Sequence, residues 1–445
     1  MGGKLALLGG RPAVSAGRDR LDELFRWPIY AQEEEDAVLG VLREGGMSGT
    51  GVTKAFEKEY AAWQGSAYAL GFCNGTAALQ AAMFACGLGV GDEMICPSVT
   101  YWASAAQVYS LGATVAFADI DPATLCISPA SIEKRISPRT KAIMVVHYLA
   151  HPADMEPIMA IAKKHGLKVI EDVSHAQGGL YKGRRLGTFG DVSAASLMSS
   201  KSLPCGEGGV LTTDGLECFE RAIAFAHYER FDADIRTESL RPYIELPMGG
   251  VKGRMHQMSS AVARVQLKYY DARCAEIRKA MNYFWDLLEG VPGIQPHRVD
   301  EATGSNMAGW YAARGIYRAE ELGGLSVTRF CQAVAAEGAP CGPGCNSALH
   351  THPLFTTADI YGHGKPTRIA NAARDVRELD GDLAESVRAG SRTYSIPWLK
   401  QFRPDLIEQH AEAFRKVSAN YGELLADDPG DPKTIGHWHF YNSRA

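Results

Sequence analysis

Residues 191–213 read DVSAASLMSSKSLPCGEGGVLTT, two apolar runs separated by a turn that carries Lys201. Serine hydroxyls precede the lysine, and a Gly-Glu-Gly-Gly sequence follows it. A lysine in a turn is most often an ordinary surface residue. The same arrangement also suits an amine that forms a Schiff base with a carbonyl cofactor whose phosphate is bound nearby.

Short apolar runs that are typical of strands recur upstream of this turn. They are AYALGF (67–72), EMICP (93–97), TVAFAD (114–119), KAIMVVH (141–147) and KVIED (168–172), and DVSAASL (191–197) and GGVLTT (208–213) form the two sides of the turn. Helical segments lie between the first five runs, and one of them, MEPIMAIAKKHG, ends in Gly166 after basic residues. Strands buried on both faces and joined by helices predict an α/β fold with a mainly parallel sheet flanked by helices.

Polar residues that follow these strands are the first candidates for a site, because ligands of such sheets bind beyond the carboxyl ends of the strands. Asn74-Gly75-Thr76 is either an ordinary helix cap or a phosphate site made of backbone N–H groups, a hydroxyl and a helix dipole. Tyr101 either packs in the core or stacks on a planar ligand. Glu171 and Asp172 either meet a cationic partner or end their strand in solvent.

Together these candidates form a set that is more specific than any member. Lys201 offers a Schiff-base amine, Asp172 an acid for a pyridinium nitrogen, Tyr101 a stacking partner, and the turn at residues 74–76 phosphate donors. These are the groups that pyridoxal 5'-phosphate (PLP) requires from a protein. The sequence therefore predicts a PLP site at the carboxyl edge of the sheet.

The chain also resembles the DegT/StrS family of PLP-dependent sugar aminotransferases, which have the fold type I of aspartate aminotransferase. The resemblance rests on NGTAAL (74–79), PSVTYWASA (97–105), FADIDPATL (117–125), VHYLAHPADM (146–155), EDVSHAQGGLYKGRRLGTFGD (171–191), SLMSSKSLPCGEGG (196–209) and GRMHQMSSAVARVQL (253–267). Weaker similarity extends to WPIY and SGTG near residues 27–51, to LHTHPLF (349–355) and to RTYSIPWL (392–399). It therefore covers nearly the whole chain.

The resemblance implies roles for individual residues. Lys201 matches the Schiff-base lysine and Asp172 the acid at the pyridinium nitrogen, so these two are the expected catalytic residues. The residues expected to bind the cofactor are Gly75, Thr76, Tyr101, Asp172, His175, Ser196, Lys201 and Lys252. His175 enters this set through the resemblance alone, because a single histidine after a strand is more often structural.

Two positions are less regular. Lys252 stands where family members commonly have an asparagine that reaches the phosphate of the neighbouring subunit, and a lysine would make that contact as a flexible point charge. His350 matches a histidine near the substrate, although a structural role is at least as common for a lone histidine. The inter-subunit contact implies a homodimer with shared active sites.

The chain is long enough for more than one packed unit. We expect an N-terminal arm over residues 1–30, a large PLP-binding domain over 31–265 and a smaller C-terminal α+β domain over 266–445. A helix without proline extends from Arg254 to Gly290 and is expected to bridge the domains, with Ala261, Val265, Leu267 and Tyr270 as its buried stripe.

Composition excludes several classes of protein. Hydrophobic residues are 46% and charged residues 22% of the chain, which is the balance of a globular protein, and a net charge of −5 gives no general affinity for nucleic acid or anionic lipid. We expect no signal peptide, no membrane span and, from scattered cysteines, a cytoplasmic location. No metal site is expected, because His437 and His439 lack further ligands.

The predicted activity is amino transfer in two half-reactions, from glutamate or glutamine to a keto-sugar, keto-cyclitol or related keto compound. A PLP-dependent dehydratase or lyase is the alternative within the fold, although family branches of that kind replace the lysine with histidine, and Lys201 is present. A PLP-binding sensor without turnover is the alternative outside enzymology. A nicotinamide dehydrogenase is rejected, because the glycines at 87–91 precede a strand instead of following one.

Overall fold

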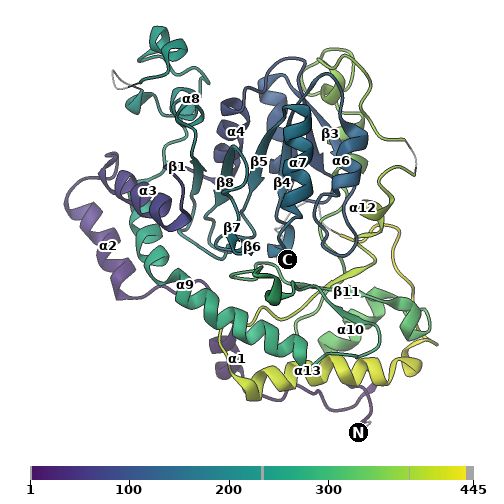
Figure 1. Cartoon of the computed structure of the whole chain (residues 1–445). Coiled ribbons are helices and arrows are strands. Elements are labelled where there is room, and N and C mark those ends of the chain that lie inside the picture. The colour runs from purple at the N-terminus through teal and green to yellow at the C-terminus, as the bar shows by residue number, and fades with distance from the viewer. Residues whose placement is uncertain (1–2, 232–234, 380, 437–445) are drawn as a thin grey trace.

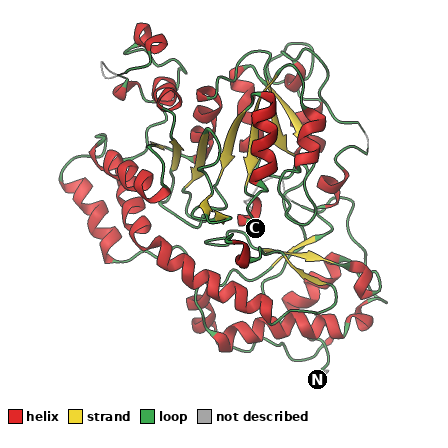
Figure 2. Cartoon of the chain, viewed as in Figure 1, coloured by secondary structure: helices red, strands yellow, loops and turns green. Residues whose placement is uncertain are grey.

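The computed structural model describes residues 3–231, 235–379 and 381–436. A large α/β unit and a smaller unit lie one above the other, and the long helix α9 (Gln257–Asp286) runs from the first to the second (Figures 1 and 2). His437 and His439, considered above as metal ligands, lie outside the described residues.

The large unit is built on a seven-stranded sheet with the order β1-β9-β8-β5-β4-β2-β3. Its strands are β1 (Tyr68–Phe72), β2 (Glu93–Pro97), β3 (Thr114–Ala118), β4 (Thr140–Val146), β5 (Lys168–Asp172), β8 (Val192–Ser196) and β9 (Gly209–Thr213). Only β9 runs antiparallel to its neighbours in this sheet. The predicted mainly parallel sheet is confirmed, and each strand lies within one residue of its predicted limits.

Helices cover both faces of this sheet. They are α3 (Gly51–Gln64), α4 (Gly75–Ala85), α5 (Ala103–Ala106), α6 (Pro129–Arg135), α7 (Met155–His165) and α8 (Leu216–Ala226). Figure 1 shows α6 and α7 in front of the sheet and α4 behind it, where α4 also packs against α8. The predicted C-terminus of α7 is confirmed, because Gly166 adopts the left-handed φ of 64° that ends the helix.

Helix α9 connects two hydrophobic cores. Its first half, including Leu267 and Tyr270, packs in the core of the large unit, and from Ile277 onward it packs in the core of the small unit. The predicted stripe of four residues is buried throughout. The arm contains α1 (Arg18–Phe25), whose Leu24 belongs to the small-unit core, and is followed by α2 (Gln32–Arg43), which packs on α9.

The small unit is the expected α+β arrangement. Its antiparallel sheet consists of β10 (Ile294–Pro296), β11 (Arg314–Tyr317) and β12 (Thr393–Ser395), and its main helices are α10 (Val327–Ala336) and α13 (Pro404–Ala419). The α-helices and strands not yet named pack against the large unit: α11 (Pro353–Thr356), α12 (Ala384–Arg388) and the hairpin of β6 (Leu180–Tyr181) and β7 (Arg184–Arg185). We propose domain limits near residues 30 and 265, although the change of core falls further along α9, between Cys274 and Ile277.

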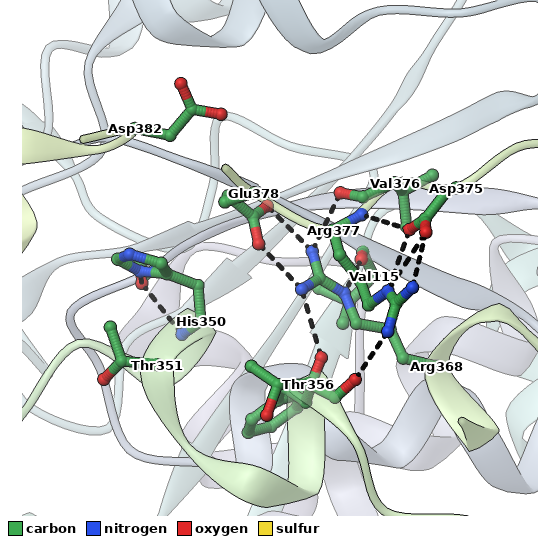
Figure 3. A network of polar contacts seen from close by, with 12 residues as sticks. Val115, His350, Thr351, Thr356, Arg368, Asp375, Val376, Arg377, Glu378 and Asp382 are labelled. Carbon is green, nitrogen blue, oxygen red and sulfur yellow. Dashed lines mark hydrogen bonds and ion pairs between the residues drawn. The ribbon is translucent and has the colours of Figure 1, made fainter. Parts of the chain in front are cut away.

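Residues 345–389 return from the small unit to the core of the large one. Arg368 connects this segment to the sheet. Its guanidinium is fully buried and pairs with both carboxylate oxygens of Glu378 at 2.7 and 2.8 Å (Figure 3). It also donates a hydrogen bond to the carbonyl of Val115 in β3. Further N–H groups donate to the carbonyls of Phe355 and Val376. All five guanidinium donors therefore have acceptors, as a buried charge requires.

Within the described ranges, no helix is both long enough and apolar enough to cross a membrane.

Candidate active site

A cavity of about 230 Å³ opens at the carboxyl ends of the parallel strands, beside the turn between β8 and β9. Seven of the predicted site residues line it: Gly75, Thr76, Tyr101, Asp172, His175, Ser196 and Lys201. These residues come from four separate strand ends, so the fold assembles the set that the sequence predicted. A larger groove of about 880 Å³ between α2, α3 and α9 contains none of them.

One end of the cavity is the N-terminus of α4. Asn74 caps this helix by accepting a hydrogen bond from the N–H of Ala77 at 2.8 Å, so the capping interpretation of this turn is correct for Asn74. The N–H groups of Gly75 and Thr76 lie in the first turn, where a helix has no acceptor of its own for them. A side chain at position 75 would place its Cβ 2.7 Å from the Cβ of Ser196. Glycine therefore lets the two phosphate-site segments approach closely.

Asp172, at the end of β5, supplies a negative charge to the cavity. Its side chain is only 5% exposed, accepts hydrogen bonds from Ser104 Oγ at 2.8 Å and from the N–H of Ser174 at 3.0 Å, and lines the cavity. These two bonds fix the carboxylate and leave it free lone pairs. An anion held in this way can keep a proton on a basic nitrogen placed against it.

Of the two alternatives raised for Glu171 and Asp172, an end of the strand in solvent is wrong, since both side chains are buried. Glu171 is fully buried, accepts from three backbone N–H groups of residues 187–190 at 2.7 to 2.8 Å, and lies 3.0 Å from His147 Nε2. The backbone donors of a following turn cannot be recognised in a sequence pattern, so this part of the Glu171 environment was not predicted.

Lys201 is buried in the wall of the cavity, with 7% of its surface exposed. Its Nζ lies 4.2 Å from the ring centroid of Tyr311, and its main-chain carbonyl accepts a hydrogen bond from Trp27 Nε1 at 2.9 Å. The interpretation of this lysine as a surface residue is therefore wrong.

His175 lies beside Lys201 as a neutral imidazole. Burial lowers the pKa of this ring well below its usual range, and the charge of Lys201 acts in the same direction. Its Nδ1 accepts a hydrogen bond from the N–H of Leu149 at 3.2 Å, which leaves the ring proton on Nε2. A neutral donor of this kind suits an oxygen atom of a ligand.

Some lining residues were missed from the sequence. Ser174 and Glu207 stand inside quoted motifs but were given no role, and both line the cavity. Tyr311 lies in NMAGWYAARG, far from the other residues, where only an aromatic side chain marks it. Tyr101 lines the cavity and also contacts Trp102, with ring centroids 4.9 Å apart, so it packs partly on the core, and its stacking on a ligand stays a prediction.

Two predicted residues do not line the cavity. Lys252 is exposed, with its Nζ 5.7 Å from the ring centroid of Tyr228. His350 is buried, and its Nδ1 lies 2.7 Å from Ser98 Oγ. Their roles at a partner's phosphate and at the substrate stay predictions.

The chemistry of the cavity fits PLP. It combines a buried amine, a fixed carboxylate, an aromatic ring and a helix N-terminus, which match the aldehyde, the pyridine nitrogen, the ring face and the phosphate of that cofactor. Over the described part of the chain, no group of three or more histidine, cysteine or acidic residues is placed to hold a metal ion.

The fold and this cavity define an aminotransferase of fold type I. The model of the DegT/DnrJ/EryC1/StrS aminotransferase family matches residues 28–380, and the chain belongs to this family. As a member, it is a transaminase, and its family depends on PLP.

Individual relatives agree with this assignment. The chain is 34% identical to the L-glutamine:2-deoxy-scyllo-inosose aminotransferase of Micromonospora echinospora, over 94% of this chain and 99% of that protein. It is 33% identical to the L-glutamine:scyllo-inosose aminotransferase of Streptomyces griseus, over 83% and 87% of the two chains. Among solved structures, it is similar to the aminotransferase from Psychrobacter cryohalolentis, with a TM-score of 0.76 and 30% identity over 89% of this chain and 99% of that one.

Proposed function

We propose that this transaminase binds PLP in the 230 Å³ cavity and moves the amino group of glutamine or glutamate to a keto-cyclitol. The observation that carries the proposal is the presence of Lys201 and Asp172 in one buried cavity whose far end is a helix N-terminus. A keto-sugar is the second acceptor class that the family allows.

The residues divide into binding and chemistry. Gly75, Thr76 and Ser196 bind the phosphate, and Tyr101 stacks on the ring. His175 donates from Nε2 to the ring oxygen, in agreement with its neutral state. Lys201 and His175 are buried among these residues, so the amine lies away from bulk solvent.

When bound, PLP supplies an aldehyde that condenses with amines and a ring that withdraws electrons from the adjacent carbon. Asp172 holds a proton on the ring nitrogen and so keeps the ring electron-poor. Lys201 Nζ would then move a proton from the carbon that carries the donor nitrogen to the cofactor, and in the second half-reaction from the cofactor to the acceptor carbon that gains the nitrogen.

The acceptor class follows from the relatives and from size. Two relatives of high coverage are named for inosose substrates, which are small keto-cyclitols. A cavity of about 230 Å³ is below the roughly 300–1,000 Å³ of most ligand pockets, so a single chain has little room beyond the cofactor. A compact cyclitol makes fewer demands on space than a nucleotide-linked sugar.

We propose a homodimer that completes the site. Tyr243, Leu246, Met248 and Val251 are 47%, 60%, 39% and 37% exposed, and they directly precede Lys252. Exposed apolar residues gathered in one segment are typical of an interface. A second copy that binds there would cover these residues, and Lys252 of the first copy would then lie near the phosphate site of the second.

The free cysteines of the described chain agree with a cytoplasmic location.

The test is to incubate the PLP-loaded protein with glutamine and 2-deoxy-scyllo-inosose and to measure the aminated product by mass spectrometry. A nucleotide-linked 4-keto sugar is offered in parallel, and Lys201→Ala is the control. Product from the cyclitol, absent in Lys201→Ala, supports the proposal. Turnover of the nucleotide sugar alone would overturn the acceptor class, and no transfer to any keto compound would overturn the activity.

A further inference from the structure

Lys201 is held at both of its ends by aromatic side chains. The indole N–H of Trp27 binds its carbonyl at 2.9 Å, and the Tyr311 ring lies 4.2 Å from its Nζ. The two aromatic residues are joined through Trp398, whose ring is 5.9 Å from Trp27 and meets Tyr311 edge-on at 5.6 Å. We call Trp27, Trp398 and Tyr311 the aromatic bracket.

The segment that presents Tyr311 has an unusual backbone. Ala308, Trp310 and Ala312 all have left-handed conformations, with φ of 43°, 51° and 54°. Residues other than glycine are strained in this region, persist there only where their surroundings enforce it, and concentrate at functional sites. Alternate left-handed residues turn the chain back and forth, and they leave the Tyr311 ring facing Lys201.

Contacts on several sides enforce this backbone. Trp398 Nε1 donates to the carbonyl of Gly309 at 2.9 Å, and the N–H of Ala308 binds Asn306 Oδ1 at 3.1 Å. A Cβ at Gly309 would lie 2.6 Å from the Cβ of Ser202, the neighbour of Lys201. The strained segment is therefore seated directly on the turn that carries the lysine.

We propose that Tyr311 is a positioning residue for Lys201: its ring face holds the amine at the cavity wall, pointed at the reacting carbon, whenever that amine is not joined to the cofactor. The proposal rests on the proposed function, since it requires Lys201 to act on bound PLP. A cation over an aromatic face is attracted by the ring itself, so the tyrosine hydroxyl is not needed for this role. The hydroxyl would be needed if Tyr311 instead acted by donating a hydrogen bond to a ligand.

Two substitutions separate these cases. Tyr311→Phe keeps the ring face, and Tyr311→Leu removes it. Tyr317→Leu is the matched control, because Tyr317 is equally buried, lies in β11 and packs against Phe330 and Tyr394 in the core of the small unit.

The experiment loads each variant with PLP and records the visible circular dichroism of the bound cofactor, the single-turnover rate constant with glutamine and the midpoint of thermal unfolding. Tyr311→Leu is expected to alter the dichroism and to lower the maximal rate constant about 10-fold, with the half-saturating glutamine concentration changed less than about 3-fold. Tyr311→Phe is expected to stay within about 3-fold of wild type in rate. Tyr317→Leu is expected to lower the thermal midpoint and leave the dichroism unchanged.

Equal losses in Tyr311→Phe and Tyr311→Leu would overturn the proposal in favour of a hydroxyl role, and a wild-type rate in Tyr311→Leu would overturn it outright. A dichroism change in Tyr317→Leu like that of Tyr311→Leu would reduce the effect to general destabilisation and overturn it as well. Failure of the proposed function is distinct, because wild type would then show no PLP band that Lys201→Ala removes.

Discussion

The indole N–H of Trp27 donates a hydrogen bond of 2.9 Å to the main-chain carbonyl of Lys201, 174 positions further along the chain. The arm that precedes the large unit thus reaches into the active-site turn. Since the arm also packs in the core of the small unit through Leu24, it connects the position of the lysine to both units.

Loss of this bond is expected to destabilise the protein. Trp27→Phe keeps an aromatic ring but leaves the carbonyl of Lys201 without its donor, which costs about 1–3 kcal/mol for a buried group. Urea unfolding monitored by far-UV circular dichroism measures the effect. Trp63→Phe is the control, because Trp63 Nε1 donates to Asp271 at an exposed position and its loss is expected to cost much less. Equal costs in the two variants would contradict the assignment.

Substitution of the two adjacent acids at the end of β5 is expected to affect different properties: Asp172→Asn the activity and Glu171→Gln the stability. Asp172→Asn keeps an acceptor for Ser104 but loses the charge, so we expect the transamination rate to fall at least about 100-fold with the fold intact. Glu171→Gln turns an amide N–H toward a turn of N–H donors, so we expect a loss of stability of about 2–4 kcal/mol. The turnover number and the urea unfolding of both variants test these two predictions. An Asp172→Asn variant with activity near that of wild type would refute the first.

Burial of a histidine predicts a pH dependence of stability. His410 in α13 is 1% exposed, neither ring nitrogen has a hydrogen-bond partner among the described residues, and burial lowers its pKa to about 4. The unfolded chain takes up this proton near pH 6.5 and the folded chain does not, so stability is present above pH 6.5 and is lost as pH falls toward 4. By pH 5 the loss from this group is about 2 kcal/mol.

His410→Leu removes the titrating group and keeps an apolar side chain of similar size. The difference in unfolding free energy between the variant and wild type is therefore expected to shift by about 2 kcal/mol in favour of the variant between pH 8 and pH 5. Urea unfolding at the two pH values measures it. A difference that does not change with pH would mean that the His410 ring reaches water in the folded protein.

The strands could be predicted almost completely from the sequence, and the site only in part. Strand limits followed from apolar runs, because burial on both faces leaves few polar residues in them. Lys201, Asp172 and Thr76 could be found because each lies at the end of a strand of the sheet or in the turn that follows it. Tyr311 could not, because its place over Lys201 depends on contacts between two units far apart in sequence and on three left-handed residues that no local propensity favours.

The buried polar networks could not be predicted from the sequence either. The pair of Arg368 and Glu378 lies in a segment rich in charges, which reads as a solvated loop, yet both side chains are buried in the structure (Figure 3). A pattern of residue types does not say which charges find partners before they are buried.

Glu378→Gln tests the weight of this pair. It leaves the Arg368 guanidinium buried without its counter-ion, which typically costs about 3–5 kcal/mol. The control is Asp375→Asn, which breaks the exposed pair with Arg377 and is expected to cost less than about 1 kcal/mol. Thermal unfolding compares the two variants, together with limited proteolysis of residues 353–382. Similar small costs would show that solvent reaches Arg368.

Lys252 offers a test of the shared active site. If it binds the phosphate in the neighbouring subunit, Lys252→Ala is expected to weaken PLP binding about 10-fold or more, since a charged contact to phosphate is lost, and to leave the thermal midpoint of the cofactor-free protein unchanged. Lys201→Ala abolishes turnover in its own subunit. A mixed dimer of the two variants then contains one complete site, built from Lys201 of one chain and Lys252 of the other.

Random mixing of the two variants makes about half of the dimers mixed, each with one of its two sites complete, so at limiting PLP about a quarter of the wild-type activity is expected. The measurement is the transamination rate before and after the variants are unfolded and refolded together. Because each variant alone is impaired, activity that rises on mixing has no source other than complementation between subunits. A mixture no more active than the average of its components would mean that Lys252 acts in its own chain or not at all.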